Sequence, residues 1–199
     1  VEDLGADILV SSAYKWFGPH QGVLWGREAL LRDTFGYKVR PAGEDLPHKF
    51  ETGTLSHEGM AGTLGAIEYL EQFGTGETRA KRIASAWKVM VQYEHALTAK
   101  LIAGLKTFKG LTIRGITSDN AMHRRVPTVS FTLDGHHPES LAKAFARDNI
   151  FVWSGHNYAI EPVSRMGLME SGGVLRVGLA HYTTEAEVDA LLSSLTRQI

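Results

Sequence analysis

The chain has 199 residues, of which 43% are hydrophobic and 22% charged, and its formal net charge is -1. This length holds one good-sized domain, or one domain and part of another. The net charge is low and the sequence has no blocks of like charge. Its charges therefore give no reason to expect binding to nucleic acid. No apolar run is long enough to span a bilayer, and the acidic N-terminus is unlike a secretory signal, so we expect no membrane partner and a cytoplasmic location. The sequence contains no cysteine, which excludes disulfides and thiolate metal sites within it.

The first predicted elements are two short strands joined by a tight turn. The apolar run 8–10 predicts a buried strand, and the glycine-bounded run 22–26 predicts a second one. Lys15 lies in the turn, just after Ser11 and Ser12. Desolvation of a lysine amine frees its lone pair for Schiff-base chemistry, and neighbouring hydroxyl and N–H groups can bind a phosphate. Position alone does not assign this role, because most lone lysines are solvated surface residues.

The following segments predict helices. One is expected near 28–35, a second over 57–73 with Ser56 as N-cap and Gly74 as a stop, and a long third one around 77–105. Apolar residues recur on one stripe of the third helix, and such a stripe is typical of a core-facing surface. The residues of this stripe are Ile83, Trp87, Met90, Val91, Leu97 and Leu101.

The remaining segments alternate between strands and helices. Strands are predicted at 111–114, 126–133, 150–153 and 174–179, and helices at 138–148 and 184–195. Thr184 and Glu187 form a capping box for the last helix. This alternation predicts a small α/β domain, with a boundary near residues 74–106.

The segment around Lys15 resembles the cofactor-lysine motif of the class V aminotransferase and cysteine desulfurase family, whose members use pyridoxal 5′-phosphate (PLP). The resemblance consists of Gly-Ala-Asp at 5–7, Ser-x-x-Lys at 12–15, Gly-Pro at 18–19 and a short strand that ends in Gly26. It implies that Lys15 forms the Schiff base with PLP and that Ser12 contacts the cofactor. It also implies the α/β fold of PLP-dependent transferases. Residues 1–74 would then end the large domain, 75–106 would be a linking helix, and 107–199 would form the small C-terminal domain.

In this family the lysine motif lies roughly halfway along the chain. The ring-stacking residue, the phosphate-binding helix and the Asp on the pyridine nitrogen belong to the preceding half, and none of them is found before Lys15. We therefore expect this sequence to be the C-terminal half of a longer enzyme and inactive by itself.

A second motif lies at 50–54, where Phe-Glu-Thr-Gly-Thr precedes the predicted helix. Free N–H groups and a hydroxyl before a helix suit a phosphate oxygen, although an ordinary turn with a helix cap has the same local sequence. The segment resembles the family's Phe-Glu-x-Gly-Thr motif. That resemblance implies that Thr54 reaches the cofactor phosphate of a neighbouring subunit, and hence a homodimer with shared active sites.

A third motif surrounds Arg176, which interrupts the apolar strand 174–179. A buried arginine needs a carboxylate partner, either in the protein or in a substrate. The resemblance assigns Arg176 to the α-carboxylate of the amino-acid substrate, whereas Tyr182 is expected to pack structurally.

The chain departs from its relatives at 152–159. Where desulfurases of this family carry Arg-x-Gly-His-His-Cys-Ala, this sequence has Trp153 in place of the arginine and Tyr158 in place of the sulfur-accepting cysteine. A phenol cannot form a persulfide, so the usual desulfurase activity is not expected. His156 is a candidate for lining the substrate pocket, and a structural role is equally open for it.

No metal site is expected. His136 and His137 are adjacent, and adjacent residues seldom bind one ion together; the turn before them favours solvated loop histidines.

Three interpretations follow. The leading one is part of a dimeric PLP enzyme that acts on an amino acid through Lys15, with transaminase, lyase or epimerase chemistry. The second is a non-catalytic binding or scaffold domain with a vestigial PLP site. The third is a fragment that folds only with its missing half, which an unpaired strand edge around 8–10 would favour.

Overall fold

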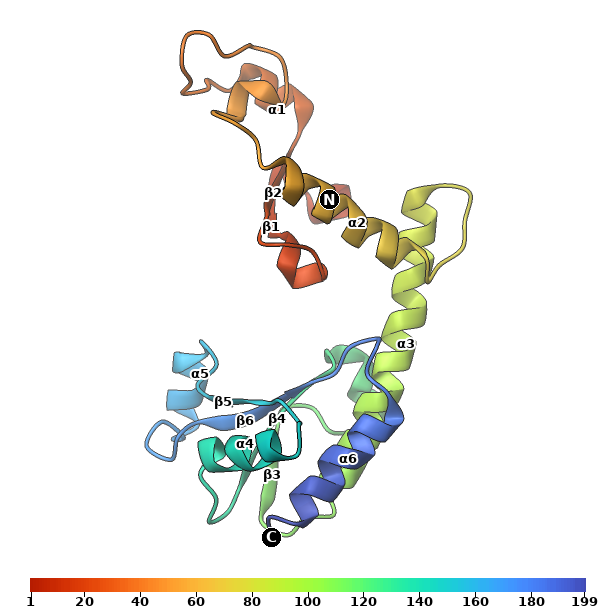
Figure 1. Ribbon diagram of the computed structural model, residues 1–199, viewed down its shortest axis with the longest axis vertical. Helices are drawn as coiled ribbons and strands as arrows, with labels where there is room; N and C mark the ends of the chain where they lie inside the picture. The colour runs from red at the N-terminus through yellow and green to blue at the C-terminus, as the bar shows by residue number, and fades with distance from the viewer. The chain divides into compact units, whose positions relative to one another are not determined.

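The computed structural model describes residues 1–199 except for the side chain of Glu2. The chain divides into two compact units, 1–86 and 87–199, whose elements are labelled in Figure 1. The division falls inside the long helix α3 (Arg79–Leu105), within the segment predicted to link two domains. None of the helices described is both long and apolar enough to cross a membrane.

The N-terminal unit begins with a two-stranded antiparallel sheet. Strand β1 (Ile8–Ser12) pairs with β2 (Gly22–Gly26), and two short 3-10 helices, η1 (Glu2–Leu4) and η2 (Ala13–Trp16), precede and follow β1. The strands form where the sequence predicted them. The expected burial is wrong, since Val10 is 68% exposed. The reason is that β1 pairs with β2 alone among the described residues, so its other edge is uncovered there.

Three more elements follow in this unit: α1 (Glu28–Asp33), η3 (His48–Phe50) and α2 (His57–Glu71). The turn between α2 and α3 is closed by Glu71, whose Oε2 accepts hydrogen bonds of 3.1 Å from Arg79 and of 3.1 Å from Arg82. Gly74 sits in this turn, and a Cβ there would lie 2.0 Å from the Arg82 carbonyl oxygen. Only glycine fits at this close approach.

The C-terminal unit is built on a four-stranded sheet with the order β3-β4-β6-β5, in which every neighbouring pair is antiparallel. Its strands are β3 (Leu111–Arg114), β4 (Thr128–Leu133), β5 (Trp153–Gly155) and β6 (Val174–Gly178). Its other elements are η4 (Asp119–Arg124), α4 (Pro138–Arg147), α5 (Ile160–Arg165) and α6 (Glu185–Thr196). In Figure 1, α4 and α6 lie beside this sheet, as does the C-terminal part of α3.

The two faces of this sheet differ in chemistry. Along β4 the buried residues Val129, Phe131 and Leu133 alternate with more polar ones, as expected for a strand with one core face. The core face packs against α3, α4 and α6 through Leu101, Phe145 and Leu195, among others. The opposite face therefore presents the intervening residues of each strand, and the candidate site is built there.

The fourth strand differs from its prediction. Residues 150–152 were expected to be in a strand, but β5 is Trp153–Gly155. The Ile150 N–H donates to the Phe145 carbonyl (3.0 Å), and Asn149 is left-handed with φ 57. These residues close the C-terminus of α4, which leaves them unable to join the sheet.

Helix α5 was not predicted, because it has only six residues, includes Pro162 and shows no usable periodicity. The core stripe predicted on α3 is confirmed for Met90, Leu97 and Leu101, which are buried, but not for Trp87 and Val91, which are exposed. His137, expected in a solvated loop, caps α4 by accepting a hydrogen bond from the Glu139 N–H (3.3 Å).

Candidate active site

Lys15 lies at the tip of the β1–β2 hairpin, within η2. The turn is fixed beneath it, since the Ala13 N–H donates to the Gln21 carbonyl (2.8 Å) and the Gly18 N–H donates to the Ala13 carbonyl (2.8 Å). A Cβ on Gly18 would lie 2.8 Å from the Ala13 Cβ, so the turn depends on this glycine. The Lys15 amine projects from this hydrogen-bonded turn. It is exposed, forms no ion pair with the described residues, and lies 5.7 Å from the centroid of the Tyr14 ring. The N-terminal unit thus holds the amine in place without desolvating it.

Thr54 lies in the loop between η3 and α2. None of the backbone N–H groups of residues 52–54 donates a hydrogen bond within the described part of the chain, and Gly53 is left-handed with φ 77. The loop therefore offers free N–H groups beside the Thr54 hydroxyl, which is a suitable donor set for an anion. Nearby, residues 51, 52 and 56 help to line a depression of about 460 Å³.

Arg176 lies in the middle of β6, on the face of the sheet opposite the core. The registers place Ser130 of β4 beside it on one side and Trp153 of β5 on the other. Its guanidinium lies over the Trp153 ring, 6.0 Å from the ring centroid, at a distance that allows a cation–π contact. Within the described residues no carboxylate lies within ion-pair distance of Arg176. The sequence allowed the carboxylate partner of Arg176 to come either from the protein or from a substrate. Because the described residues provide none, a carboxylate from a substrate is favoured.

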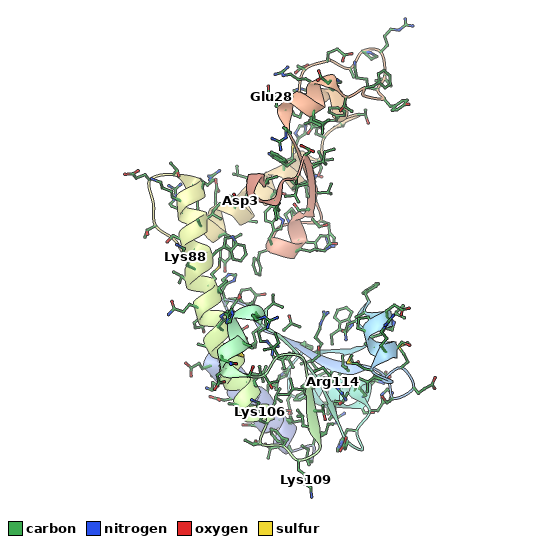
Figure 2. All side chains as sticks on the ribbon, turned by 180° about the vertical axis from the view of Figure 1, so that it is seen from behind. Asp3, Glu28, Lys88, Lys106, Lys109 and Arg114 are labelled. Carbon is green, nitrogen blue, oxygen red and sulfur yellow. The ribbon has the colours of Figure 1, made fainter. Side chains whose placement is uncertain are left out.

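A second arginine, which the sequence analysis did not single out, extends this row. Arg114 of β3 lies directly opposite Ser130, so the four strands carry Arg114, Ser130, Arg176 and Trp153 side by side. Figure 2 labels Arg114 on this sheet. Its Nη2 donates to the Thr132 hydroxyl (2.9 Å), whereas its Nε is buried and has no hydrogen-bond partner among the described residues.

A cavity of about 240 Å³ lies over the first three residues of this row, between the sheet and α5. Its polar lining comes from Arg114, Ser130, His156, Asn157 and Arg176. The His156 Nδ1 accepts a hydrogen bond from the Tyr158 N–H (3.2 Å). A neutral imidazole with this tautomer carries its proton on Nε2, which leaves one donor for a ligand.

The turn after β5 projects Tyr158 away from the protein. Asn157 and Tyr158 both have left-handed backbones, with φ 51 and φ 61, and Asn157 Nδ2 donates to the Gly155 carbonyl (3.0 Å). Tyr158 is 96% exposed. The turn is thus well defined by its own hydrogen bonds, and the residue at its tip is a phenol.

The segment after β6 is held against α3. Tyr93 donates its hydroxyl proton to the Thr183 carbonyl (2.7 Å), and His181 Nδ1 lies 4.0 Å from Glu94 Oε1. Burial raises the pKa of Glu94 and lowers the pKa of His181, so both side chains are biased toward their neutral forms. Tyr182 stacks edge-on against His181, with the ring centroids 5.2 Å apart. These contacts fix the C-terminal end of the strand that carries Arg176.

The five predicted site residues fall into two groups. Lys15, Ser12 and Thr54 belong to the N-terminal unit, and Arg176 and His156 belong to the C-terminal unit, where they line one cavity. The donor sets fit PLP and an amino acid: a primary amine on a rigid turn, free N–H and hydroxyl groups for a phosphate, and a guanidinium for a carboxylate. No group of three or more potential metal-ligating side chains gathers among the described residues.

Comparison with known proteins gives a consistent result. The family described as aminotransferase class-V matches residues 1–191. The chain is 32% identical over 199 residues to an aminotransferase-like protein of Gibberella zeae, covering 98% of this chain and 46% of that protein. It is 31% identical over 209 residues to a probable cysteine desulfurase of Mycolicibacterium paratuberculosis, covering 99% of this chain and 28% of that protein.

The fold is similar to that of solved cysteine desulfurases. The structure of the enzyme from Thermococcus onnurineus matches with a TM-score of 0.80 and 24% identity, over 100% of this chain and 48% of that one. The Escherichia coli enzyme CsdA matches with a TM-score of 0.75 and 23% identity, over 99% of this chain and 47% of that one. The predicted α/β fold is confirmed, and the chain spans about half or less of the length of these relatives.

Proposed function

Because the chain belongs to the class V aminotransferase family, we propose that it is part of a PLP-dependent enzyme that acts on an amino acid, with Lys15 as the residue that carries the cofactor. The observation that carries this proposal is the Lys15 amine, which stands unpaired on a hydrogen-bonded turn. A hydrogen-bonded turn presents the amine in one orientation, which suits a covalent attachment point.

Each of the other predicted residues has a role that suits its chemistry. Ser12 and the free N–H groups around Thr54 would bind the phosphate, with Thr54 supplied by the second subunit of a homodimer. Arg176 would hold the substrate α-carboxylate, and His156 would donate a hydrogen bond in the same cavity. PLP, when bound, stabilises negative charge at the substrate Cα. The Lys15 amine, once released from the cofactor, would accept the Cα proton.

We propose that the reaction is transamination, elimination or epimerisation rather than persulfide-forming desulfuration. Two observations support this choice: the 199 residues contain no cysteine, and the turn after β5 presents the phenol of Tyr158. A phenol oxygen cannot accept and carry a sulfur atom as a thiolate does.

The test is to locate the cofactor on the full natural chain that contains these residues. The protein is incubated with PLP and reduced with borohydride, and the labelled peptide is identified by mass spectrometry. We expect one pyridoxyl group, on Lys15, and we expect Lys15→Ala to abolish it.

Lys88→Ala is the matched control, because Lys88 is also an exposed lysine, on α3 (Figure 2). This variant should label like the wild type. Labelling that is spread over surface lysines, or that survives Lys15→Ala, would overturn the proposal in favour of a non-catalytic binding domain.

A further inference from the structure

We propose that the substrate is an amino acid with a second carboxylate on its side chain, and that Arg114 is the residue that recognises this second carboxylate. The inference rests on one part of the proposed function, namely that Arg176 binds the α-carboxylate of the substrate. The other end is argued from the sheet face that carries both arginines.

The register of the sheet brings the two guanidinium groups to one surface. Arg114 is opposite Ser130, and Ser130 is opposite Arg176, so all three side chains leave the same face. Two strand spacings of ~4.8 Å separate the Arg114 and Arg176 backbones by roughly 10 Å. Ser130 between them is small, and it leaves room for a ligand that touches both arginines.

The hydrogen bonding of Arg114 is incomplete in a specific way. Nη2 is satisfied by the Thr132 hydroxyl, but the enclosed Nε has no acceptor among the described residues. An enclosed N–H without an acceptor costs free energy. A carboxylate typically pairs with a guanidinium through two parallel N–H groups, and the described residues accept from only one nitrogen of Arg114, so its donors are not saturated by the fold.

The charges around the cavity point the same way. Its described lining includes two arginines and His156, and none of its described lining residues is acidic. Asp134 lines an adjoining depression of about 430 Å³ that Arg114 also borders, but it lies beyond the 4.0 Å ion-pair distance from the arginine. Neither guanidinium is therefore neutralised within the described part of the chain.

Two unneutralised guanidinium groups on one half-buried surface repel each other, and the low dielectric there strengthens that repulsion. A monocarboxylic amino acid would neutralise only one of them. A dicarboxylic amino acid neutralises both, and it gains the second ion pair without a second cost of association. The site should therefore prefer acidic substrates over neutral ones of similar length.

The test measures binding rather than turnover. Glutarate and butyrate are titrated by calorimetry, at low ionic strength, into the full natural chain without added PLP. We expect glutarate to bind at least about tenfold more tightly than butyrate, because one additional charged hydrogen-bonded pair contributes that much affinity. Arg114→Leu should remove this preference by weakening glutarate alone, and Arg114→Lys should keep part of it.

Arg124→Leu is the matched control, since it removes the same charge from the exposed 3-10 helix η4. It should keep the preference for glutarate. Equal affinities for the two acids in the wild type, or a preference that survives Arg114→Leu, would overturn the inference. A thermal midpoint of Arg114→Leu close to that of the wild type shows that the variant still folds. A preference for glutarate that is partly kept in Arg114→Lys shows that the charge at this position is what matters.

This outcome is independent of the cofactor test. Failure of the borohydride trapping at Lys15 would remove the proposed function and leave a diacid site on the sheet. Failure of the glutarate preference, with Lys15 labelled, would leave a PLP enzyme whose substrate has a neutral side chain.

Discussion

Some buried polar side chains in the C-terminal unit have hydrogen-bond partners within the protein, and others have none among the described residues. Ser194 is fully buried, and its hydroxyl donates to Asp148 Oδ2 at 2.5 Å. The same oxygen accepts a hydrogen bond of 2.5 Å from Arg197. By contrast, the enclosed Arg114 Nε and Asn157 Oδ1 have no partner among the described residues, and both residues line the same cavity. These two residues thus border one cavity, and each keeps a polar atom that the described residues leave without a partner.

The Asp148 carboxylate gives a prediction about acid stability. The hydrogen bonds from Ser194 and Arg197 lower the pKa of Asp148 in the folded protein. A carboxyl with a depressed folded pKa stabilises the fold fully above its unfolded pKa of about 3.9 and loses this effect as the pH falls through the folded value. We expect Asp148→Asn to lower the urea midpoint at neutral pH and to flatten its fall on acidification below about pH 4.

Asp119→Asn is the control, because it removes a carboxylate from the exposed surface of η4. It should retain the wild-type pH dependence of the midpoint. If Asp148→Asn keeps the full acid dependence as well, the two hydrogen bonds do not act as described.

At the scale of the secondary-structure elements, α6 depends on its N-terminal cap. The Thr184 Oγ1 accepts the Glu187 N–H (3.2 Å), and the Thr184 N–H donates to the Glu187 carboxylate (2.7 Å). Thr184→Ala removes the first of these bonds and should cost about 1 kcal/mol of unfolding free energy, as cap substitutions commonly do.

Chemical denaturation of the variant measures this cost. Ser193→Ala, at an exposed position late in the same helix, should change the free energy by a few tenths of a kcal/mol at most. A Thr184→Ala variant as stable as Ser193→Ala would mean that the capping box does not contribute.

The elements that the sequence predicted well are those with a local signal. Strand β3 was predicted to the residue, since apolar Leu111 and Ile113 alternate with polar residues between two glycines. The prediction placed strand β5 too early because it did not use Asn149, which ends α4 in a left-handed conformation and was the available sign of a helix C-terminus. The placement of Arg114 on the same sheet face as Arg176 was missed because it depends on the register of β3, β4 and β6, which are separated in the chain. The available signal was Arg114 at the end of a strand whose residues alternate between apolar and polar.

At the scale of the whole chain, the two units differ in how much apolar surface they bury. The buried apolar residues of the N-terminal unit are Ala13, Ala66, Leu70 and Ala86 among those described, three of them alanines. The C-terminal unit buries a continuous cluster that joins its sheet to three helices through residues such as Phe131, Phe145 and Leu175. Because apolar burial supplies most of the folding free energy, the C-terminal unit should be the more stable of the two.

Hydrogen exchange on the 199-residue chain tests this difference. A two-stranded sheet is marginal when little packs on it, so amides of β1 and β2 should open locally at low cost. We expect those of β4 and β6 to exchange at least about a hundredfold more slowly after correction for intrinsic rates, which is a difference of ~3 kcal/mol in opening free energy. Helix α6, in the same unit as β4, serves as the internal reference for high protection. Equal protection of the hairpin and β4 would show that the N-terminal unit is stabilised by more than its own buried side chains. Interactions other than the hydrogen bonds of the Lys15 turn would then have to protect the hairpin amides from exchange.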